Sequence, residues 1–190
     1  MSESEMIDEL LVDAGERMAK SVESTRDQFG SVRTGRAMPA LLDRVSVDYY
    51  GAVTPLKQMA TINAPEPRLL TVTPFDKSSI KSIEKAIIDS DVGLTPGNDG
   101  NLIRLSIPEL TEERRRELVK VVRNIAEEGR VAIRNIRRDV MHDLRELKDE
   151  GDVGSDDEHR AETELQKLTD ARVAELDAML KHKEDDILEV

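Results

Sequence analysis

Arginine is concentrated in one short stretch of this sequence, between residues 114 and 138. The stretch holds nine basic side chains and three acidic ones, and eight of the nine basic residues are arginine. A guanidinium is weakly hydrated, and its planar fork of N–H donors matches the oxygens of a phosphate. The stretch therefore has the composition needed to contact phosphate groups or RNA.

Helical geometry arranges these side chains on one surface. At about 100° per residue, most of them fall on a stripe about 100° wide, and Arg145 falls on the same stripe further along. Apolar residues recur at steps of three and four from Leu118 to Leu147 on the opposite side. A merely solvated helix face is the alternative, but the shortage of acids among these residues favours phosphate contact. We predict an RNA-binding face, the arginine stripe, formed by Arg116, Lys120, Arg123, Arg130, Arg134, Arg137 and Arg138.

The overall charge narrows the kind of RNA contact that is possible. The chain has 190 residues, a formal net charge of −12 and a pI near 4.8, which argues against nucleic acid covering the whole surface. The acidic excess lies in residues 1–30 and 151–190. Aromatic residues make up only 2% of the chain, so a platform for stacking single-stranded bases is missing. We expect a structured RNA held by its backbone on one face.

Other kinds of chemistry find no support in the sequence. The chain has no cysteine, which excludes disulfides, zinc ribbons and thiol catalysis. It has no phosphate-binding loop motif, and its three histidines lie far apart in the sequence. We therefore expect a binding protein that is not an enzyme and needs no cofactor or metal. No apolar run reaches the roughly 18–20 residues of a membrane span, and the acidic start is unlike a secretory leader, so we expect a cytoplasmic protein.

Three long helices should position the arginine stripe. Apolar spacing predicts helices over residues 6–29, over about 112–150 and from 155 to the end, with a turn at 151–154. Gly30 follows the first apolar series and predicts a C-cap. Thr111 predicts the N-cap of the second helix, followed by two glutamates that favour its first turn. Such helices bury their apolar faces most simply in a three-helix bundle.

The residues between the first two helices have a different character. Alternating or β-branched runs predict strands at 45–49, 69–73 and 102–107, and helical spacing predicts a helix over 77–89. The chain is therefore expected to be α+β, with a bundle of residues 1–30 and 108–190 that holds an inserted domain of residues 31–107. Two short connections permit hinge motion, which we place at Gly30, Ser31, Ser106 and Ile107.

Several motifs together resemble one family over the full length of the chain. The matching stretches follow the family's order: 33–37 (RTGRA), 47–51 (VDYYG), 55–56 (PL), 72–76 (VTPFD), 93–100 (GLTPGNDG), 108–115 (PELTEERR) and 130–139 (RVAIRNIRRD). On these residues the chain resembles the ribosome recycling factor family.

The resemblance implies an L-shaped, two-domain protein with a small β/α/β domain inserted in a three-helix bundle. It implies a translation factor that binds the post-termination ribosome and, with elongation factor G and GTP, splits it so that mRNA and tRNA leave. The matching motif puts Arg130, Arg134, Arg137 and Arg138 against large-subunit rRNA, and the hinges let the inserted domain swing. We also expect a monomer with no membrane partner. The competing hypothesis is a helical adaptor or co-chaperone that uses the same stripe to bind an acidic protein.

Overall fold

A computed structural model describes residues 2–189 and shows an α+β protein, which confirms the predicted class. Its residues group into two compact units. One contains the residues up to Arg33 together with Arg116–Asp185, and the other contains Thr34–Arg115 together with the residues from Asp186 onward. The sequence-based boundaries at 30/31 and 107/108 stay predictions. The first turn of the second long helix belongs to the smaller unit.

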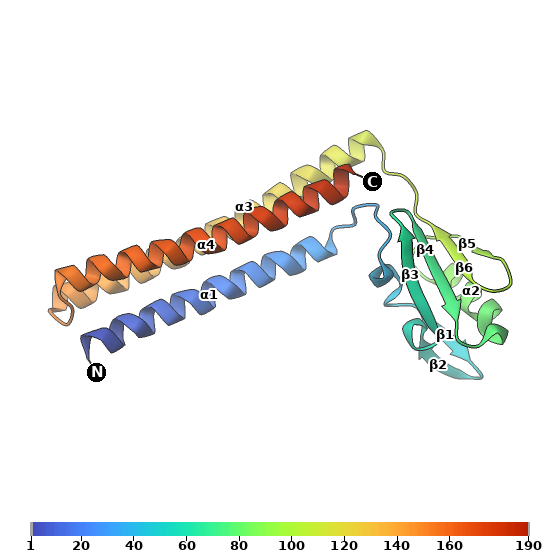
Figure 1. Cartoon of the computed structure of the whole chain (residues 1–190), viewed down its shortest axis with the longest axis horizontal. Helices are drawn as coiled ribbons and strands as arrows, with labels where there is room; N and C mark the ends of the chain where they lie inside the picture. The colour runs from blue at the N-terminus through green and yellow to red at the C-terminus, as the bar shows by residue number, and fades with distance from the viewer. Residues whose placement is uncertain (1, 190) are drawn as a thin grey trace. The chain divides into compact units, whose positions relative to one another are not determined.

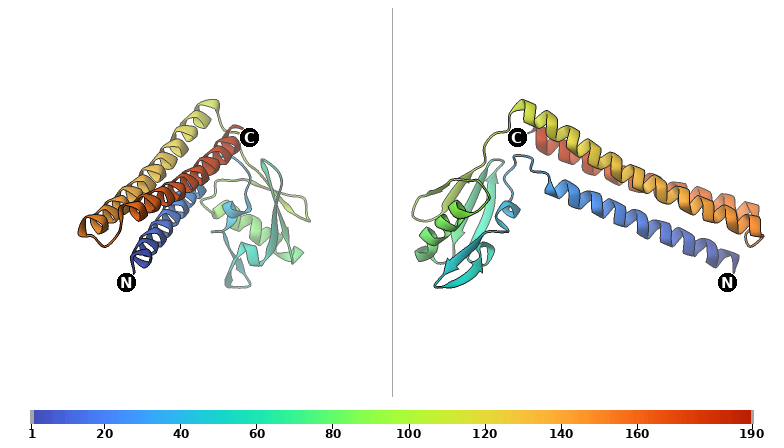
Figure 2. Two further views of the ribbon diagram at one scale, coloured as in Figure 1. Left: turned by 60° about the vertical axis from the view of Figure 1, so that its left-hand side comes forward. Right: turned by 180° about the vertical axis from the view of Figure 1, so that it is seen from behind.

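The larger unit is built from α1 (Glu3–Ser31), α3 (Glu112–Glu150) and α4 (Ser155–Leu188). The helices run side by side in all views (Figures 1 and 2). Their apolar faces meet in one core made by side chains that are at most 8% exposed: Ala14, Met18, Val22, Ile133, Ile136, Val140, Leu144, Ala161, Leu165 and Leu176. Burial of these faces holds the long helices together, because none could bury its stripe alone.

Local hydrogen bonds explain where the helices begin and end. Ser2 and Glu5 form a reciprocal capping box, so α1 begins three residues before the predicted start. The predicted C-cap at Gly30 is wrong, because α1 continues to Ser31, whose hydroxyl donates to the Gln28 carbonyl at 2.7 Å. The predicted N-cap of α3 is confirmed, since the Thr111 hydroxyl accepts from the backbone N–H of Arg114 at 3.1 Å.

The bundle helices approach one another closely at Gly129 of α3. A Cβ atom added there would lie 2.5 Å from Oγ1 of Thr25 on α1 and 3.0 Å from Cδ1 of Leu176 on α4. Thr25 is buried, and its hydroxyl donates to the Ser21 carbonyl at 3.0 Å. The glycine therefore allows two neighbouring helices to contact the α3 backbone at the middle of the bundle.

The smaller unit contains two antiparallel sheets and one α-helix. β1 (Ser46–Tyr49) pairs with β2 (Ala52–Pro55) through a turn at Tyr50 and Gly51, which both have positive φ. A four-stranded sheet has the order β3-β4-β6-β5, and α2 (Ile80–Asp89) follows a short 3-10 turn and buries Ile80, Ile83 and Ile87. The remaining strands are β3 (Ala60–Glu66), β4 (Leu69–Pro74), β5 (Pro96–Asn98) and β6 (Ile103–Ser106).

The strand predictions match the sheet unevenly. β1, β4 and β6 lie within the runs at 45–49, 69–73 and 102–107 or extend at most one residue beyond them, as predicted. The sequence analysis missed β2, β3 and β5. The last two form the edges of the four-stranded sheet and contain proline. Proline is tolerated at an edge because no neighbouring strand needs its missing N–H, so it is a poor guide to the end of an edge strand.

Candidate nucleic-acid interface

The arginine stripe lies outside the bundle core along α3. Leu118, Val122, Ile133 and the other buried residues of α3 occupy the inner side of the helix. Five members of the stripe are exposed and two, Arg130 and Arg137, are half-buried. The structure therefore brings the seven predicted residues onto one helix and away from the core, as their spacing requires.

Neighbouring α4 supplies acidic partners to part of the stripe. Arg123 Nε lies 2.6 Å from a carboxylate oxygen of Glu184, and Arg130 contacts Asp177 through Nε at 2.8 Å and Nη2 at 2.6 Å. A step of seven residues forward on α3 is thus matched by a step of seven residues back on α4. This is the spacing at which antiparallel helices repeat a contact.

Two further contacts lie toward the turn that joins the two helices: Arg145 with Glu162 keeps the same register, whereas Arg137 contacts a residue of α4 that is four positions out of register. Arg137 Nη1 donates to the side-chain oxygen of Gln166 at 2.7 Å, and Arg145 Nε lies 3.9 Å from Glu162. We call these cross-helix contacts the charge ladder. It consists of the four contacts that α4 makes with Arg123, Arg130, Arg137 and Arg145 of α3. The ladder joins α3 to α4 at several points and gives several stripe residues a partner within the chain.

Two arginines of the charge ladder have a raised pKa. The hydrogen bond to Glu184 raises the pKa of Arg123 above its ordinary value. Burial lowers the pKa of Arg130, but its hydrogen bonds to Asp177 and Glu127 outweigh that effect, so the pKa is raised. Both side chains stay cationic at any physiological pH, so their ability to bind an anion does not depend on titration.

Other members of the stripe are less compensated by carboxylates. Arg134 is 50% exposed and lies 3.5 Å from Glu127 on its own helix. Lys120 and Arg138 are exposed and make no hydrogen bond or ion pair within residues 2–189. Arg116 is also exposed and has an interaction of its own. The open part of the stripe therefore includes Lys120, Arg134 and Arg138.

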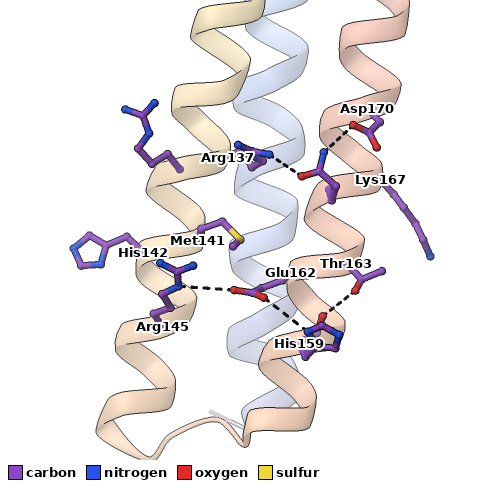
Figure 3. A pocket seen from close by; sticks show the side chains of 11 residues that line it. Arg137, Met141, His142, Arg145, His159, Glu162, Thr163, Lys167 and Asp170 are labelled. Atoms are coloured by element: carbon purple, nitrogen blue, oxygen red, sulfur yellow. Dashed lines mark hydrogen bonds and ion pairs between the residues drawn. The ribbon is translucent and has the colours of Figure 1, made fainter.

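A groove of about 850 Å³ runs between α3 and α4 near the turn that joins them (Figure 3). We call it the α3/α4 groove. Two histidines that the sequence analysis set aside as distant from one another both line it. The lining residues are Arg137, Arg138, Met141, His142 and Arg145 of α3 and His159, Glu162, Thr163, Gln166, Lys167 and Asp170 of α4.

Sequence reasoning missed the contribution of α4 to this interface. It counted the acids on α3 alone, whereas the partners of Arg123 and Arg130 come from the next helix. The signal was present in the predicted turn at 151–154, which makes α3 and α4 antiparallel neighbours. Pairing residues at equal distances from that turn would have placed Arg123 and Arg130 within two residues of their partners on α4.

The predicted hinge residues lie at the ends of regular elements. Gly30 and Ser31 form the last residues of α1. Ser106 ends β6, and Ile107 is 9% exposed with its N–H donating to the Arg68 carbonyl at 2.9 Å. Residues 32–38 and 107–111 have no regular helix or strand. The hinge role of the four residues stays a prediction.

Within the part of the chain that the structure describes, no group of three or more histidine, aspartate or glutamate side chains is placed to hold a metal ion. In the same residues, every helix is too short or too polar to pass through a lipid bilayer. The geometry found is thus that of an extended cationic surface beside a groove.

Comparison with known proteins identifies the family. The model for ribosome recycling factor matches residues 25–188. The ribosome-recycling factor of Rubrobacter xylanophilus is 58% identical over 98% of this chain and all of its own, and that of Bacillus subtilis is 53% identical over 97% of this chain and all of its own.

Solved structures agree in both sequence and fold. A solution structure of the ribosome recycling factor has a TM-score of 0.73 at 38% identity and covers 97% of this chain and 98% of its own. A second structure has a TM-score of 0.65 at 48% identity and covers 99% of this chain and all of its own. That structure models the T. thermophilus ribosome recycling factor and the E. coli elongation factor G bound to the E. coli post-termination complex. These matches span nearly the whole chain, and the chain belongs to the ribosome recycling factor family.

Proposed function

We propose that this chain recycles ribosomes after termination. It binds the post-termination ribosome in the cytoplasm and, with elongation factor G and GTP, splits it into subunits so that mRNA and tRNA are released. The observation that carries the proposal is the full-length similarity to a ribosome recycling factor, 48% identical, in a structure with elongation factor G and the post-termination complex. The family is one of non-enzymatic translation factors, so GTP is hydrolysed by the partner.

The arginine stripe is the proposed rRNA-binding surface of the bundle. Its guanidinium groups lie along one exposed helix, and phosphates along an RNA backbone offer a matching series of anions. Lys120, Arg134 and Arg138 would make the first contacts because they have the least compensation from carboxylates. Arg116, Arg123, Arg130 and Arg137 would add contacts as RNA phosphates compete with their present partners. The RNA is then recognised by its shape and backbone.

The hinge residues have a mechanical role in this proposal. The smaller unit, with its own sheet and core, can move as one body when the translocase pushes on the ribosome-bound factor. Gly30 and Ser31 precede the irregular segment 32–38, and Ser106 and Ile107 lie at the start of the irregular segment 107–111; these two segments connect the long helices to the sheets. Backbone rotation near these residues would change the orientation of the smaller unit while the bundle stays on rRNA.

Sedimentation of the chain with bacterial ribosomes over a series of salt concentrations tests the proposal. Phosphate contacts release counterions, so affinity should fall steeply and linearly on logarithmic axes as salt rises. Arg134→Gln should reduce the slope by about 1 and weaken binding, while changing unfolding free energy by no more than about 0.5 kcal/mol because the side chain is half exposed.

Arg160→Gln provides the matched control. Arg160 is 74% exposed on α4, is paired with Asp157, and lies beside α1, outside both the stripe and the groove. It should leave the salt slope unchanged. Light scattering can monitor subunit splitting by the chain with elongation factor G and GTP. Arg134→Gln should split subunits less well than the wild type, and Arg160→Gln should match the wild type. Absence of ribosome binding by the wild-type chain at low salt would contradict the proposed function.

A further inference from the structure

Among the described residues of the smaller unit, four strands lie at the edges of the two sheets, and β1 differs from the other three. β2, β3 and β5 contain Pro55, Pro65 and Pro96. Proline lacks the N–H with which an edge would bind a further strand, so proteins use it to block exposed edges. β1 contains no proline, so its backbone keeps the groups needed to pair with another chain.

The register of the β1–β2 hairpin shows which backbone groups of β1 are free. In an antiparallel pair, successive residues direct their backbone groups alternately toward and away from the partner strand. The Leu56 N–H donates to the Val45 carbonyl at 3.0 Å, so Val45 and every second residue after it face β2. The N–H and C=O groups of Ser46 and Asp48 therefore point to the other side. Within residues 2–189 these groups make no hydrogen bond.

A groove of about 510 Å³ lies between β1 and α2, and we call it the β1/α2 groove. Ser46 and Asp48 line one wall, and α2 forms the other wall with the i, i+3, i+4, i+7 pattern of one helical face: Ser82, Lys85, Ala86 and Asp89. Val45 is buried and Ala86 half-buried, so both add apolar surface to the groove. A free strand edge beside a helix allows an extended peptide to extend the sheet and to place alternate side chains against the helix.

The charges of this groove favour a protein segment of mixed charge over RNA. Each wall carries one cation and one anion, which are Arg44 and Asp48 beside β1 and Lys85 and Asp89 on α2. None of the four forms an ion pair within residues 2–189, so each is available to an incoming chain. The charges sum to zero, so the groove has no general attraction for a polyanion.

The order of charges along β1 also favours one direction for the incoming chain. Opposite charges on paired strands stabilise the pair, whereas like charges destabilise it. A strand that runs antiparallel to β1 passes Asp48 first and Arg44 four positions later. The complementary segment therefore has a basic side chain followed, four residues later, by an acidic one.

We propose that the β1/α2 groove binds an extended segment of a protein partner, which adds an antiparallel strand to the free edge of β1. Backbone groups of Ser46 and Asp48 supply the main-chain hydrogen bonds. The side chains of Asp48 and Arg44 pair with the basic and the acidic residue of the segment. Apolar residues between these two lie near Val45 and Ala86. This surface belongs to the smaller unit and is separate from the arginine stripe, so it goes beyond the proposed contact with RNA.

Hydrogen exchange of the full-length chain, followed residue by residue by NMR, tests the proposal. The probe is a synthetic acetylated and amidated peptide, Thr-Lys-Val-Thr-Val-Glu-Thr. Without peptide, the amides of Ser46 and Asp48 should exchange faster than the amide of Val47, which faces β2. With peptide at about ten times its dissociation constant, the exchange of both free-edge amides should slow about tenfold, because only the unbound fraction exchanges.

Matched controls test the backbone pairing and the direction of the segment. A peptide with proline in place of the central threonine lacks a main-chain donor and should give no protection. A peptide with its lysine and glutamate exchanged should bind several-fold more weakly. Arg44→Glu should weaken binding of the original peptide to a similar degree. Lys57→Glu makes the same charge change at an exposed position of the smaller unit outside the groove, so it should bind like the wild type.

Three results would overturn the proposal. Equal exchange of the Ser46, Asp48 and Val47 amides in the free chain would show that the β1 edge is not free. Unchanged exchange of Ser46 and Asp48 at millimolar peptide, or equal protection by the proline peptide, would exclude strand addition. Equal peptide affinity of Arg44→Glu and Lys57→Glu would exclude the pairing of charges that sets the direction. The experiment contains no ribosomes, so its outcome is independent of the proposed function.

Discussion

Replacing Gly129 with alanine tests how closely the bundle helices approach. The new methyl group would lie 2.5 Å from Thr25 Oγ1 and 3.0 Å from Leu176 Cδ1, so α1 or the Thr25 side chain must move by about 1 Å. Overpacking of this kind costs about 1–3 kcal/mol, and moving Thr25 disturbs its hydrogen bond to the Ser21 carbonyl. The better helix propensity of alanine offsets about 1 kcal/mol. We expect a net destabilisation of about 1–2 kcal/mol.

Gly15→Ala is the matched control and should have the opposite sign. Gly15 also lies within a long bundle helix, α1, but a Cβ atom there would meet nothing within 4 Å. Only the propensity gain remains, so this variant should be stabilised by about 0.5–1 kcal/mol. At about 4 °C per kcal/mol for a unit of roughly 100 residues, the melting temperatures of the two variants should differ by about 6–12 °C.

Two spectroscopic probes can show whether the loss of stability in Gly129→Ala lies in the bundle. Most helical residues lie in α1, α3 and α4, so far-UV circular dichroism follows the bundle. Tyr49 and Tyr50 both lie in the smaller unit, so tyrosine fluorescence follows that unit and should be little changed.

A double-mutant cycle adds a stricter test. Combining Gly129→Ala with Thr25→Ala removes the atom that the new methyl group contacts most closely, so part of the lost stability should return. Equal stabilisation by Gly129→Ala and Gly15→Ala would refute the close approach of α1 and α3. Failure of the double variant to recover stability would show that Thr25 is not the source of the strain.

Two further predictions concern the smaller unit. The Tyr49 hydroxyl donates to Asp76 at 2.9 Å, and this hydrogen bond raises the pKa of Tyr49 above its ordinary value. The contact therefore stabilises the fold at pH values below the ordinary tyrosine pKa, and this stabilisation is lost as the pH rises through the raised pKa. Ultraviolet titration of a Tyr50→Phe chain should show this raised pKa, and adding Asp76→Asn should lower it; equal titrations would contradict the assignment. Gly35→Ala should destabilise this unit by about 1–2 kcal/mol in urea unfolding followed by tyrosine fluorescence, because Gly35 has a φ of 76° and its Cβ would lie 2.8 Å from Leu110 Cγ. Unchanged stability would mean that this left-handed position accepts a side chain.

The fold could be predicted where one periodic signal continues over many residues. The 39 residues of α3 carry apolar positions at steps of three and four without a break, and both of its predicted ends agree with the structure. The end of α1 could not be predicted in this way. Gly30 suggested a stop, but the hydroxyl of Ser31 bonds to the last turn and the helix continues. A local side-chain contact outweighed the general preference of glycine for helix ends.

The candidate site could be predicted only from one side. Helical spacing placed the arginine stripe on a single face of α3, because that result depends on residues of one element. The charge ladder depends on the alignment of two elements, so the pairing of Arg130 with Asp177 requires the register between α3 and α4. The α3/α4 groove requires that register as well, since it joins residues more than twenty positions apart such as Arg145 and Lys167.

The distribution of charge along α3 offers a physical reason for an acidic chain to bind RNA in one orientation. Arg123 and Arg145 are 22 residues apart on α3, which is about 33 Å at about 1.5 Å per residue. This separation exceeds three Debye lengths, each about 10 Å at 0.1 M salt, so the two ends of the ladder attract phosphates almost independently. Near Arg123, a carboxylate lies 2.6 Å from the guanidinium, whereas near Arg145 the carboxylate is at 3.9 Å, but residues 139–158 around the turn hold nine acidic and only two basic side chains. In the proposed function, RNA phosphates therefore approach the bundle along the arginine stripe and are repelled by the acidic residues at the turn, and this difference along α3 favours one direction of docking.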